Sequence, residues 1–555
     1  MAQEKTSLEK AGHLEYTHRE DGVAADAWHH GVDAEKLPTG YFRSSFFLGT
    51  MLASGLSVSA GVGGFALAAP LLATINAEIG PDPDIVWVAL VYTMTLAIGQ
   101  ALVGRLSDIF GRRWFFIGGS FLALIGCIIS AVAHNVPALV GGTALIGFVA
   151  ASQLSYTFVL GELVPFKFRF MSLGFVYIWA IPFSGFGPAL SYALVQHPGP
   201  GWRSCYYPMI VINAAATPCW FLFYHPPTFH MKYADRKSRL QVVKDLDFIG
   251  LILFIGGLLI FLMGRSWGGS SFMPLKKPLV PMHLFRNMKW VSVVMLVVVG
   301  ASVYYAFAII WPTIIFMLYI SGLTYGGWLA CVTRCAINTG QVSGGWLSKH
   351  VGRQKWQLVA CSIASCAMLG AAGCATPNNK NTIIGLLFVG CFFIGWLESV
   401  GLAMTGIVID DQNEIGTAVD VAGSIRSAVS TVASTLYTVV LTNRLEKTIP
   451  AVVPPALVKA GLPVASVPSF LSAITVGTPA AFAAVDGLTD AIELAGITAY
   501  KPASSQAYRT VMLVTIAFLG LGLFFSFWAP NVDELMTNRV SQTLHKRKDE
   551  NVVGA

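Results

Sequence analysis

Long apolar segments recur along this 555-residue chain and limit what it can fold into. A helix needs about 20 mostly apolar residues to cross a bilayer. Hydrophobic residues make up 55% of the chain and charged residues only 12%, so a water-soluble fold would have too few polar residues to cover its core. The sequence therefore predicts an all-α polytopic membrane protein. Thirteen candidate spans are visible, at roughly 46–74, 85–105, 114–134, 137–161, 170–196, 205–224, 248–264, 289–311, 325–347, 357–375, 382–408, 415–442 and 509–529.

Lysine and arginine are concentrated in alternate loops, which predicts the orientation of the spans. Arg105, Arg112 and Arg113 follow the second span, whereas the loop at 78–84 after the first span carries no base. We therefore expect the first six spans to begin and end in the cytosol. The expected organisation is a disordered cytosolic tail at 1–42, a six-helix bundle at 43–224, a cytosolic linker with one helix at 225–288, a second six-helix bundle at 289–530, and a cytosolic tail at 531–555.

A repeated motif relates the two predicted bundles. GRLSDIFGR at 104–112 recurs as GWLSKHVGR at 345–353, displaced by 241 residues. Two such copies indicate two related bundles in parallel orientation, so both copies should face the cytosol. A single span at 248–264 between the bundles would invert the second one. Either 248–264 does not cross, or one linker helix has been lost near 268–273, for example through a misread intron, and we favour the loss.

The motif is also the candidate gate. Gly104 and Gly111 allow close backbone approach, and Asp108 and Arg112 can form a charge-assisted pair that opens and closes as a two-state latch. The alternative is a solvated turn with anchoring bases. The copy has Lys349 in place of the acid, so it cannot pair in the same way. The predicted gating set is Gly104, Arg105, Asp108, Gly111, Arg112, Arg113, Gly345, Gly352 and Arg353.

Ionisable residues inside spans are costly and are functional candidates. Glu398 and Arg426 lie within spans and could form a pair that binds and releases a proton, or a permanent salt bridge. Arg334 is a third proton-coupling candidate. Four acids near predicted cytosolic helix ends are expected to be solvated caps: Glu162, Asp410, Asp411 and Glu414.

Aromatic and amide residues within the spans are candidate substrate contacts, because apolar pockets with a few polar groups suit a terpenoid-like ligand. Each of them could instead face lipid or the protein core. The candidates are Gln153, Tyr156, Trp179, Tyr304, Tyr305 and Trp311.

The connection at 443–508 is much longer than the others after the first span, with 66 residues and seven prolines. By the parity of the second bundle it should lie outside the cell. We expect a spacer or a partly ordered lid, with substrate capture as the alternative.

Several functional classes find no support in the sequence. It has no phosphate-binding glycine loop followed by Lys-Ser/Thr, no zinc-binding helix motif and no nucleophile elbow. The nine cysteines show no metal-ligand spacing, and a net charge of +7 from so few charges is not typical of a nucleic-acid binder. We expect neither an enzyme nor a bound cofactor or metal, but transport driven by an ion gradient.

Several motifs resemble those of a known family. GRLSDIFGRR resembles the loop between the second and third helices of the major facilitator superfamily. GELVP at 161–165, PLVPMHLFR at 278–286 and residues 409–445 are similar to the fungal trichothecene efflux pump family. The resemblance covers most of 40–530 and implies fourteen helices, two of them linking the bundles. It also implies an antiporter bend at Gly185, Gly187 and Pro188, although Phe183 and the pair Ser191-Tyr192 depart from the fuller pattern. Asp420 replaces a small residue of the family.

The resemblance and the residues together predict proton-coupled efflux of an apolar secondary metabolite, toxin or drug, trichothecene-like, by alternating access. A proton-symport importer of ferric siderophores is the first alternative, and a non-transporting sensor is the second. The expected partners are an apolar small molecule, protons and the lipid bilayer, with no nucleic acid, and we expect a monomer. The expected location is the plasma membrane, or a vacuolar or vesicle membrane, with both termini cytosolic.

Overall fold

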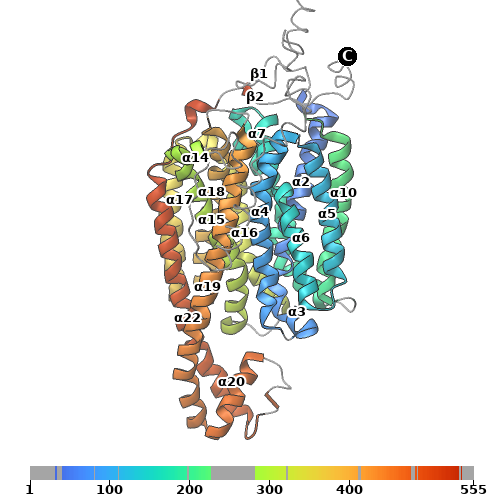
Figure 1. Cartoon of the computed structure of the whole chain (residues 1–555). Helices are drawn as coiled ribbons and strands as arrows, with labels where there is room; N and C mark the ends of the chain where they lie inside the picture. Colours follow the sequence, from blue (N-terminus) through green and yellow to red (C-terminus); the bar gives the residue numbers. More distant parts are fainter. Residues whose placement is uncertain are drawn as a thin grey trace, which may run out of the picture.

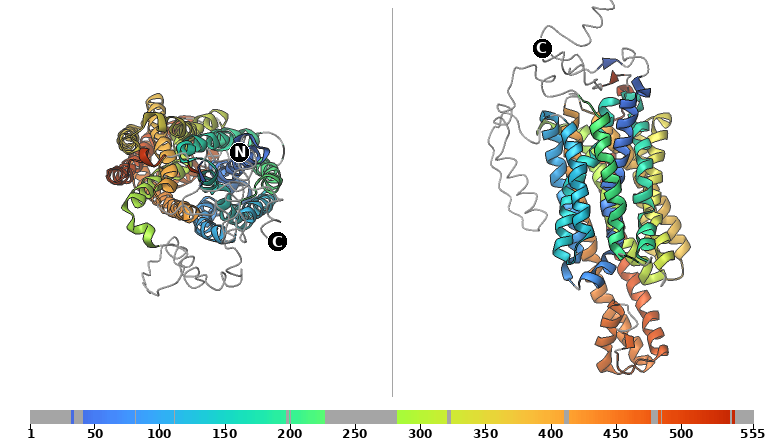
Figure 2. Two further views of the ribbon diagram at one scale, coloured as in Figure 1. Left: turned by 90° about the horizontal axis from the view of Figure 1, so that it is seen from above. Right: turned by 90° about the vertical axis from the view of Figure 1, so that its right-hand side faces the viewer.

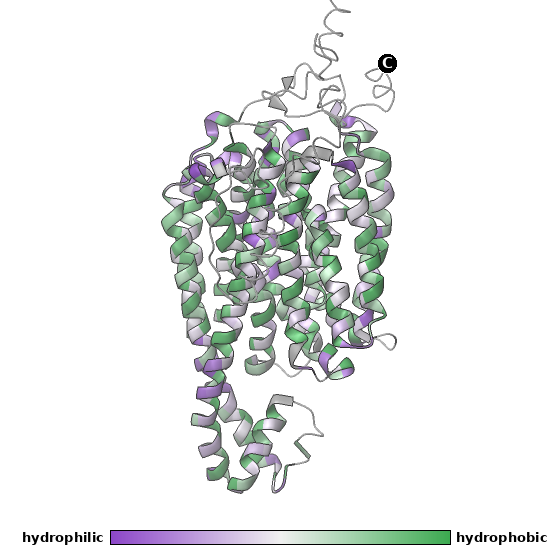
Figure 3. Cartoon of the chain, viewed as in Figure 1, coloured by the Kyte–Doolittle hydropathy of each residue, from purple (hydrophilic) through white to green (hydrophobic). Residues whose placement is uncertain are grey.

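Two sets of long, nearly parallel helices lie side by side in the computed structural model (Figures 1 and 2). Apolar residues cover much of their length, and polar residues gather toward the ends of the bundle (Figure 3). The structure describes residues 32–33, 41–80, 82–110, 112–196, 199, 201–226, 282–319, 323–409, 414–476, 482–483, 485–536 and 539–540. The expected linker helix at 248–264 therefore lies outside the described residues.

The first set of helices is built from residues 45–223. Local sequence explains where several of them begin: the Ser44 hydroxyl accepts a 3.2 Å hydrogen bond from the Phe47 N–H, and the Asn135 side chain accepts one of 2.8 Å from the Ala138 N–H. Such caps satisfy backbone donors that the first helical turn leaves free. The helices are α2 (Ser45–Ala66), α3 (Leu72–Ile79), α4 (Trp87–Phe110), α5 (Arg113–Ala131), α6 (Val136–Leu154), α7 (Tyr156–Leu163), α8 (Arg169–Ala180), α9 (Gly187–Gln196) and α10 (Tyr206–Phe223).

The second set of helices is built from residues 282–526. Close packing between two of them depends on glycine: a Cβ atom at Gly340 would lie 2.0 Å from the Phe392 carbonyl oxygen, and one at Gly395 would lie 2.0 Å from the Ile337 carbonyl oxygen. Small residues at such contacts are a usual solution in membranes, where burial of apolar surface drives association weakly. The helices are α14 (Met282–Arg286), α15 (Met288–Ile314), α16 (Leu323–Val351), α17 (Gln354–Ala371), α18 (Lys380–Ile407), α19 (Ile415–Ala460), α20 (Val467–Val476) and α22 (Asp490–Ser526).

Nine helical segments among the described residues are long and apolar enough to cross a membrane. The long helices α10, α16 and α19 run beside these segments, and α16 and α19 carry the charged residues Arg334 and Arg426 within their length. Large apolar side chains are exposed on the outside of the bundle, among them Trp114, Val211 and Phe524. That distribution fits a multi-pass membrane protein whose outer surface contacts lipid.

Both copies of the repeated motif lie at the same end of the bundle, the end that also carries α7, α14 and the short strands β1 (Val32–Asp33) and β2 (Arg539–Val540) (Figure 1). We call it the terminal end, and the opposite end, which carries α3 and α20, the distal end. Val32 pairs with Val540 in the antiparallel ladder. The two halves are thus parallel, as the repeat predicts.

The parallel arrangement bears on the linker between the halves. Helix α10 finishes at the terminal end, where the rings of Phe46 and His225 are 5.6 Å apart. Helix α14 begins at the same end, where His283 Nε2 lies 2.9 Å from Glu414 Oε2. The described chain therefore leaves the first helix set and enters the second at the same end of the bundle.

The long connection at 443–508 is largely helical where it is described, rather than a loop. Helices α19 and α22, of 46 and 37 residues, run for roughly 70 and 55 Å at 1.5 Å per residue, well beyond a hydrocarbon core of about 30 Å. They project from the distal end and pack with α20 (Figure 1). This distal subdomain has its own apolar cluster, which includes Val453, Leu457 and Phe470.

Candidate functional site

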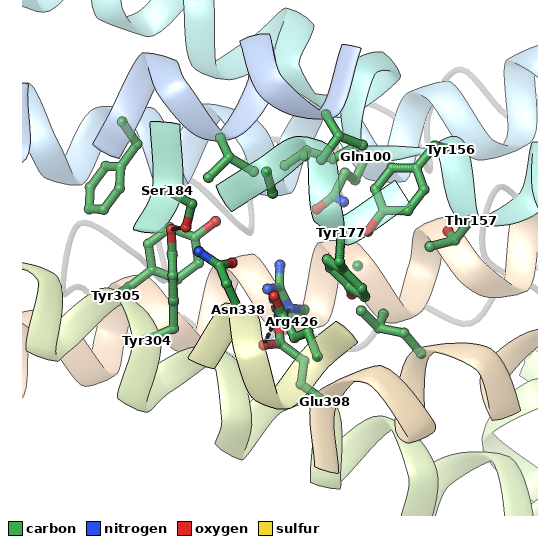
Figure 4. Close-up of a pocket in the computed structure, with 18 of the residues that line it drawn as sticks. Gln100, Tyr156, Thr157, Tyr177, Ser184, Tyr304, Tyr305, Asn338, Glu398 and Arg426 are labelled. Carbon is green, nitrogen blue, oxygen red and sulfur yellow. Dashed lines mark hydrogen bonds and ion pairs between the residues drawn. The ribbon is translucent and has the colours of Figure 1, made fainter. Parts of the chain in front are cut away.

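A small cavity lined by both apolar and polar side chains lies in the middle of the molecule, between the two helix sets. Its volume is about 70 Å³, which is room for a few water molecules, since each needs about 10–15 Å³. A larger ligand would require the two sets to move apart. Figure 4 labels the polar side chains that line it: Gln100, Tyr156, Thr157, Tyr177, Ser184, Tyr304, Tyr305, Asn338, Glu398 and Arg426.

Glu398 on α18 and Arg426 on α19 form an ion pair in the wall of this cavity (Figure 4). The Arg426 Nε donates to Glu398 Oε1 at 2.9 Å, and Gln341 Nε2 donates to Glu398 Oε2 at 3.0 Å. Glu398 is fully buried, whereas 14% of the Arg426 side chain is exposed. A buried carboxylate needs such partners, because leaving it unpaired would cost several kcal/mol.

Tyrosines provide the apolar faces of the cavity. The rings of Tyr156 and Tyr177 pack edge to face with centroids 6.2 Å apart, and the Arg426 guanidinium lies 5.8 Å from the centre of the Tyr305 ring. The hydroxyls of Ser184 and Tyr304 are 3.0 Å apart. The cavity can thus contact a ligand through flat apolar surfaces and a few hydroxyl groups.

The predicted substrate contacts divide into two groups. Tyr156, Tyr304 and Tyr305 line the cavity. The other three are engaged elsewhere: Gln153 Nε2 donates to Asn213 Oδ1 at 2.6 Å, Trp179 packs against Gly55, and Trp311 Nε1 donates to the Leu329 carbonyl at 3.0 Å.

Sequence reasoning missed the lining residues Gln100, Tyr177, Ser184 and Asn338. Each is a polar side chain inside an apolar segment, which is the signal that could have found them. Arg334 does not join the Glu398 pair; its guanidinium lies 5.8 Å from the ring centres of both Phe65 and Tyr304.

The predicted helix bend coincides with a change in helix type. Ile181–Gly185 forms a π-helical turn between α8 and α9, immediately before Gly187 and Pro188. Beyond it, the Ser191 hydroxyl donates to the Leu67 carbonyl at 2.8 Å, and a Cβ at Gly187 would lie 3.3 Å from the Ala66 carbonyl oxygen. The turn therefore brings α9 against the end of α2.

At the terminal end, Arg112 forms a buried ion pair with Glu162, and only 2% of each side chain is exposed. The expectation that Glu162 is a solvated cap was therefore wrong: α7 turns it inward, against the motif. Arg113 Nη2 donates to the Phe221 carbonyl at 2.7 Å. The side chains of Arg105 and Asp108, and all of Gly111, lie outside the described residues, as do Asp410 and Asp411.

One face of α19 contacts α4 and α7 of the other helix set. The Ser155 hydroxyl donates to Asp420 Oδ1 at 2.8 Å, and a Cβ at Gly104 would lie 2.5 Å from the Asp420 Cβ. Ser424 Oγ donates to the Ala97 carbonyl at 2.7 Å. Gly104 of the motif therefore admits Asp420, which is why an acid can stand at that position.

The second copy of the motif contacts the first helix set most closely at a glycine. A Cβ at Gly345 would lie 2.5 Å from the Cα of Gly174 on α8. Downstream, Gly352 and Arg353 adopt φ angles of 64° and 50°, which turn the chain into α17. The Lys349 Nζ lies 4.9 Å from the centre of the Phe168 ring, so Lys349 faces the first helix set through an aromatic ring.

The two sets also touch on the distal side of the cavity. Thr324 Oγ1 donates to Gln196 Oε1 at 2.9 Å, and a Cβ at Gly327 would lie 3.0 Å from the Tyr192 ring. Contacts on both sides of a small polar centre describe a molecule in which neither side is widely open.

Known proteins with similar sequences are transporters. The fungal trichothecene efflux pump family model matches residues 6–277 and 270–553, and the two matches meet within the linker. A trichothecene efflux pump, TRI12, of Trichoderma arundinaceum is 26% identical, covering 94% of this chain and 92% of that protein. The TRI12 pump of Fusarium sporotrichioides is 25% identical, covering 93% and 92%.

Solved structures agree on the fold. A bacterial homologue of the human lysosomal transporter Spinster superposes with a TM-score of 0.56 at 12% identity, covering 88% of this chain and 97% of that one. The human organic anion transporter MFSD10 superposes with a TM-score of 0.51 at 12% identity, covering 85% and 99%. The family match over nearly the whole chain, and the two parallel helix sets around a central cavity, lead to one conclusion: the chain belongs to the fungal trichothecene efflux pump family of major facilitator transporters.

Proposed function

We propose that this protein exports an apolar, oxygen-bearing secondary metabolite of the trichothecene type in exchange for protons. The observation that carries the proposal is the buried Glu398–Arg426 pair in the wall of the central cavity. A carboxylate that is reachable from a cavity in mid-membrane can bind and release a proton as access alternates between the two sides.

The coupling we propose uses the same pair. When Glu398 is ionised, its attraction to Arg426 and the hydrogen bond from Gln341 hold α16, α18 and α19 together. Protonation removes the charge that Arg426 pairs with, and therefore favours a different arrangement of these helices. Glu398 and Arg426 are our proposed coupling residues.

The substrate class follows from the cavity wall. Tyr156, Tyr177 and Tyr305 offer flat apolar surface, and the Ser184 and Tyr304 hydroxyls can hydrogen-bond to oxygen atoms of a ligand. That combination suits a compact apolar molecule with a few oxygen groups. The direction of transport is taken from the relatives that are named as efflux pumps.

We further propose that the terminal end faces the cytosol and that the protein acts in the plasma membrane. Arg112, Arg113, Lys349 and Arg353 lie at that end, and short cytosolic loops are enriched in such bases. The proposed gate consists of the two motif copies with Glu162, and its opening would separate Gly345 from Gly174.

The test is the accumulation of a labelled trichothecene in yeast cells that lack their own exporters, with and without this protein and a proton uncoupler. Lower accumulation that the uncoupler reverses is the expected result. Equal accumulation, with the protein confirmed at the cell surface, contradicts the proposal, and uncoupler-sensitive uptake of a ferric siderophore would assign the protein to import instead.

The linker requires its own control. We propose that one helix is lost near 268–273, close to where the two family matches overlap, because α10 ends and α14 begins at the same end of the bundle and a single span would join opposite ends. Sequencing the transcript across this point tests the idea, and a read identical to this sequence would refute it. If an insertion is found, the longer protein replaces this one in the transport assay.

A further inference from the structure

Helix α16 carries three polar residues on one face, of which Asn338 and Gln341 line the cavity and Arg334 lies about one turn farther along the helix. Arg334, Asn338 and Gln341 are separated by four and three residues, so they share one face of the helix. At 1.5 Å per residue, Asn338 and Gln341 lie roughly 6 and 10 Å beyond Arg334 toward the terminal end. Gln341 donates to Glu398, whereas Arg334 Nη1 and Nη2 and Asn338 Nδ2 have no hydrogen-bond acceptor among the described residues.

Arg334 is buried, with 2% of its surface exposed. Both of its terminal nitrogens, Nη1 and Nη2, lack a hydrogen-bond acceptor among the residues that the structure describes. The neighbours of the guanidinium are the rings of Phe65 and Tyr304, each with its centre 5.8 Å away. Rings of this kind attract a cation, but they do not satisfy its N–H groups, and a buried donor without an acceptor is costly.

Asn338 is also buried, with a side-chain donor that lacks an acceptor among the described residues. It is 2% exposed, it lines the cavity, and its Nδ2 donor has no acceptor within the described part of the chain. Gly185 leaves room beside it, since a Cβ there would lie 3.2 Å from that nitrogen. In Figure 4 the amide of Asn338 lies between the Glu398 pair and the hydroxyls of Ser184 and Tyr304.

At and beside this end of the cavity, three buried donor atoms, Arg334 Nη1 and Nη2 and Asn338 Nδ2, thus lack an acceptor among the described residues. Native proteins rarely leave several buried donors unsatisfied unless a ligand or water completes them. The missing chemistry is an oxygen acceptor, and a planar guanidinium with an adjacent amide suits an acyl oxygen, which has lone pairs in one plane.

We propose that Arg334 and Asn338 form a recognition subsite for an acyl oxygen of the exported compound, an ester carbonyl or a carboxylate. The apolar body of the compound packs on Phe65 and Tyr304, and the acyl group lies against the two donors. Along α16, Arg334 lies roughly 10 Å and Asn338 roughly 5 Å from Gln341, which contacts the coupling pair, so substrate and proton occupy different residues. Arg334 is accordingly a substrate-binding residue and not a proton carrier. The inference rests on the proposed function only in taking the central cavity as the place where the exported compound binds.

The test measures binding to the purified full chain in detergent with matched labelled probes: an acetylated trichothecene, its deacetylated parent alcohol, and the hemisuccinate ester of that alcohol. The wild-type protein should bind the ester more tightly than the alcohol. Arg334→Met should raise the Kd of the ester about 10- to 100-fold, the loss expected for a hydrogen bond to a charged group, and change the Kd of the alcohol less than about 3-fold. Preference for the hemisuccinate over the acetate would identify the carboxylate form.

Two further variants separate recognition from structure. Arg334→Lys keeps the charge but loses the planar fork, so it should restore part of the ester affinity. Asn338→Leu should raise the ester Kd about 3- to 10-fold, the effect of losing one neutral hydrogen bond. Arg444→Met is the control, because Arg444 is exposed and donates to Thr510, and it should leave both Kd values unchanged.

Stability provides an independent readout. If Arg334 is an unsatisfied buried cation, replacing it with the apolar Met should raise the melting temperature of the ligand-free protein. A lower melting temperature, an unchanged ratio of ester to alcohol affinity, or equal loss of both probes would each overturn the proposal. Uncoupler-sensitive export of the alcohol tests the proposed function separately. Export of the alcohol can fail while Arg334-dependent binding of the ester persists, and export can persist while Arg334-dependent binding fails.

Discussion

The carboxylate of Asp533 accepts a 2.9 Å hydrogen bond from the backbone N–H of Arg353, although 180 residues separate the two. Its other oxygen accepts a 2.7 Å hydrogen bond from Gln354 Nε2. The segment that follows the last long helix thus caps the start of α17, directly after the second copy of the repeated motif. That copy has Lys349 where the first has an acid, and a distant part of the chain brings a carboxylate to it.

We expect Asp533→Ala to destabilise the second motif. The variant removes the acceptor for the first turn of α17, a loss of about 1–2 kcal/mol for a helix cap, and leaves Arg353 in a left-handed conformation without support. Thermal unfolding of the purified protein in detergent measures the change. Glu534→Ala, one position later, is the control; an equal effect of the two variants would show that the cap has no special role.

The same contact predicts a pH dependence. Partial burial by itself raises the pKa of the Asp533 carboxyl, but hydrogen bonds from Arg353, Gln354 and Asn531 outweigh it and lower the pKa below its ordinary value of 3.8. Because the pKa is lower in the folded state, the stabilisation is present above about pH 4 and is lost as the pH falls through the folded-state value. The difference in melting temperature between wild type and Asp533→Asn should be constant between about pH 5 and about pH 7, and should shrink in more acid buffer.

Glu398→Gln should uncouple transport from the proton gradient. The amide has nearly the same shape but cannot carry the proton, so export against a gradient should be lost and cellular accumulation should rise to the level of cells without the protein, whereas exchange of labelled for unlabelled substrate should persist. Glu78→Gln is the matched control, because Glu78 is about half exposed and pairs with Arg203 at the distal end. Full uncoupler-sensitive export by Glu398→Gln would place the proton site elsewhere.

The Arg112–Glu162 pair should be strongly coupled. Removing one partner of a buried ion pair takes away charge compensation from the other and costs about 3–5 kcal/mol, so Glu162→Gln and Arg112→Gln should each lower the stability of the purified protein. The double variant should lose less than the sum of the two single losses, since both residues share one interaction. Additive losses in this double-mutant cycle would show that the two residues act independently.

Gly345→Ala should impair transport through shape alone. The new methyl group would meet the Cα of Gly174 at 2.5 Å, which prevents the two helix sets from closing at the terminal end. We expect export to fall at least about tenfold, an effect of about 1.4 kcal/mol or more on the closed state. Gly118→Ala is the control, since a Cβ there meets nothing within 4 Å; equal activity of the two variants would exclude this contact as part of the gate.

The distal subdomain should be able to unfold locally. Phe470 is fully buried in its cluster, and truncation to alanine should cost about 3–5 kcal/mol, concentrated in α20 and the projecting ends of α19 and α22. Limited proteolysis of the purified Phe470→Ala variant should then cleave it within 443–508. Leu494→Ala is the control, because Leu494 is 66% exposed, and it should be cleaved like wild type. Cleavage spread over the whole chain would indicate that the subdomain is not an independent unit.

Much of the architecture could be predicted from local sequence. Apolar runs of spanning length place the helices, because a backbone in lipid must satisfy its hydrogen bonds within each segment. The repeat at 104–112 and 345–353 predicted two parallel halves, and the odd number of visible spans exposed the problem in the linker. Glu398 and Arg426 were recognisable as functional candidates because a charge within an apolar segment is costly wherever the helix packs.

The pairing of those charges was decided by tertiary structure. Local sequence cannot show that Arg112 meets Glu162 or that Asp533 caps α17. Nor can it show that Trp311 packs in the core while Tyr177 faces the cavity. Each outcome depends on how helices distant in sequence are rotated against one another. The same holds for 443–508. Its length and prolines led to the expectation of a spacer or a partly ordered lid, whereas its described residues belong largely to α19, α20 and α22, which pack against one another. The sequence alone determined which segments are apolar enough to cross the membrane and which residues are too polar to face lipid. Tertiary packing decided which of those residues meet, because contacts within a helix are local in sequence and contacts between helices are not.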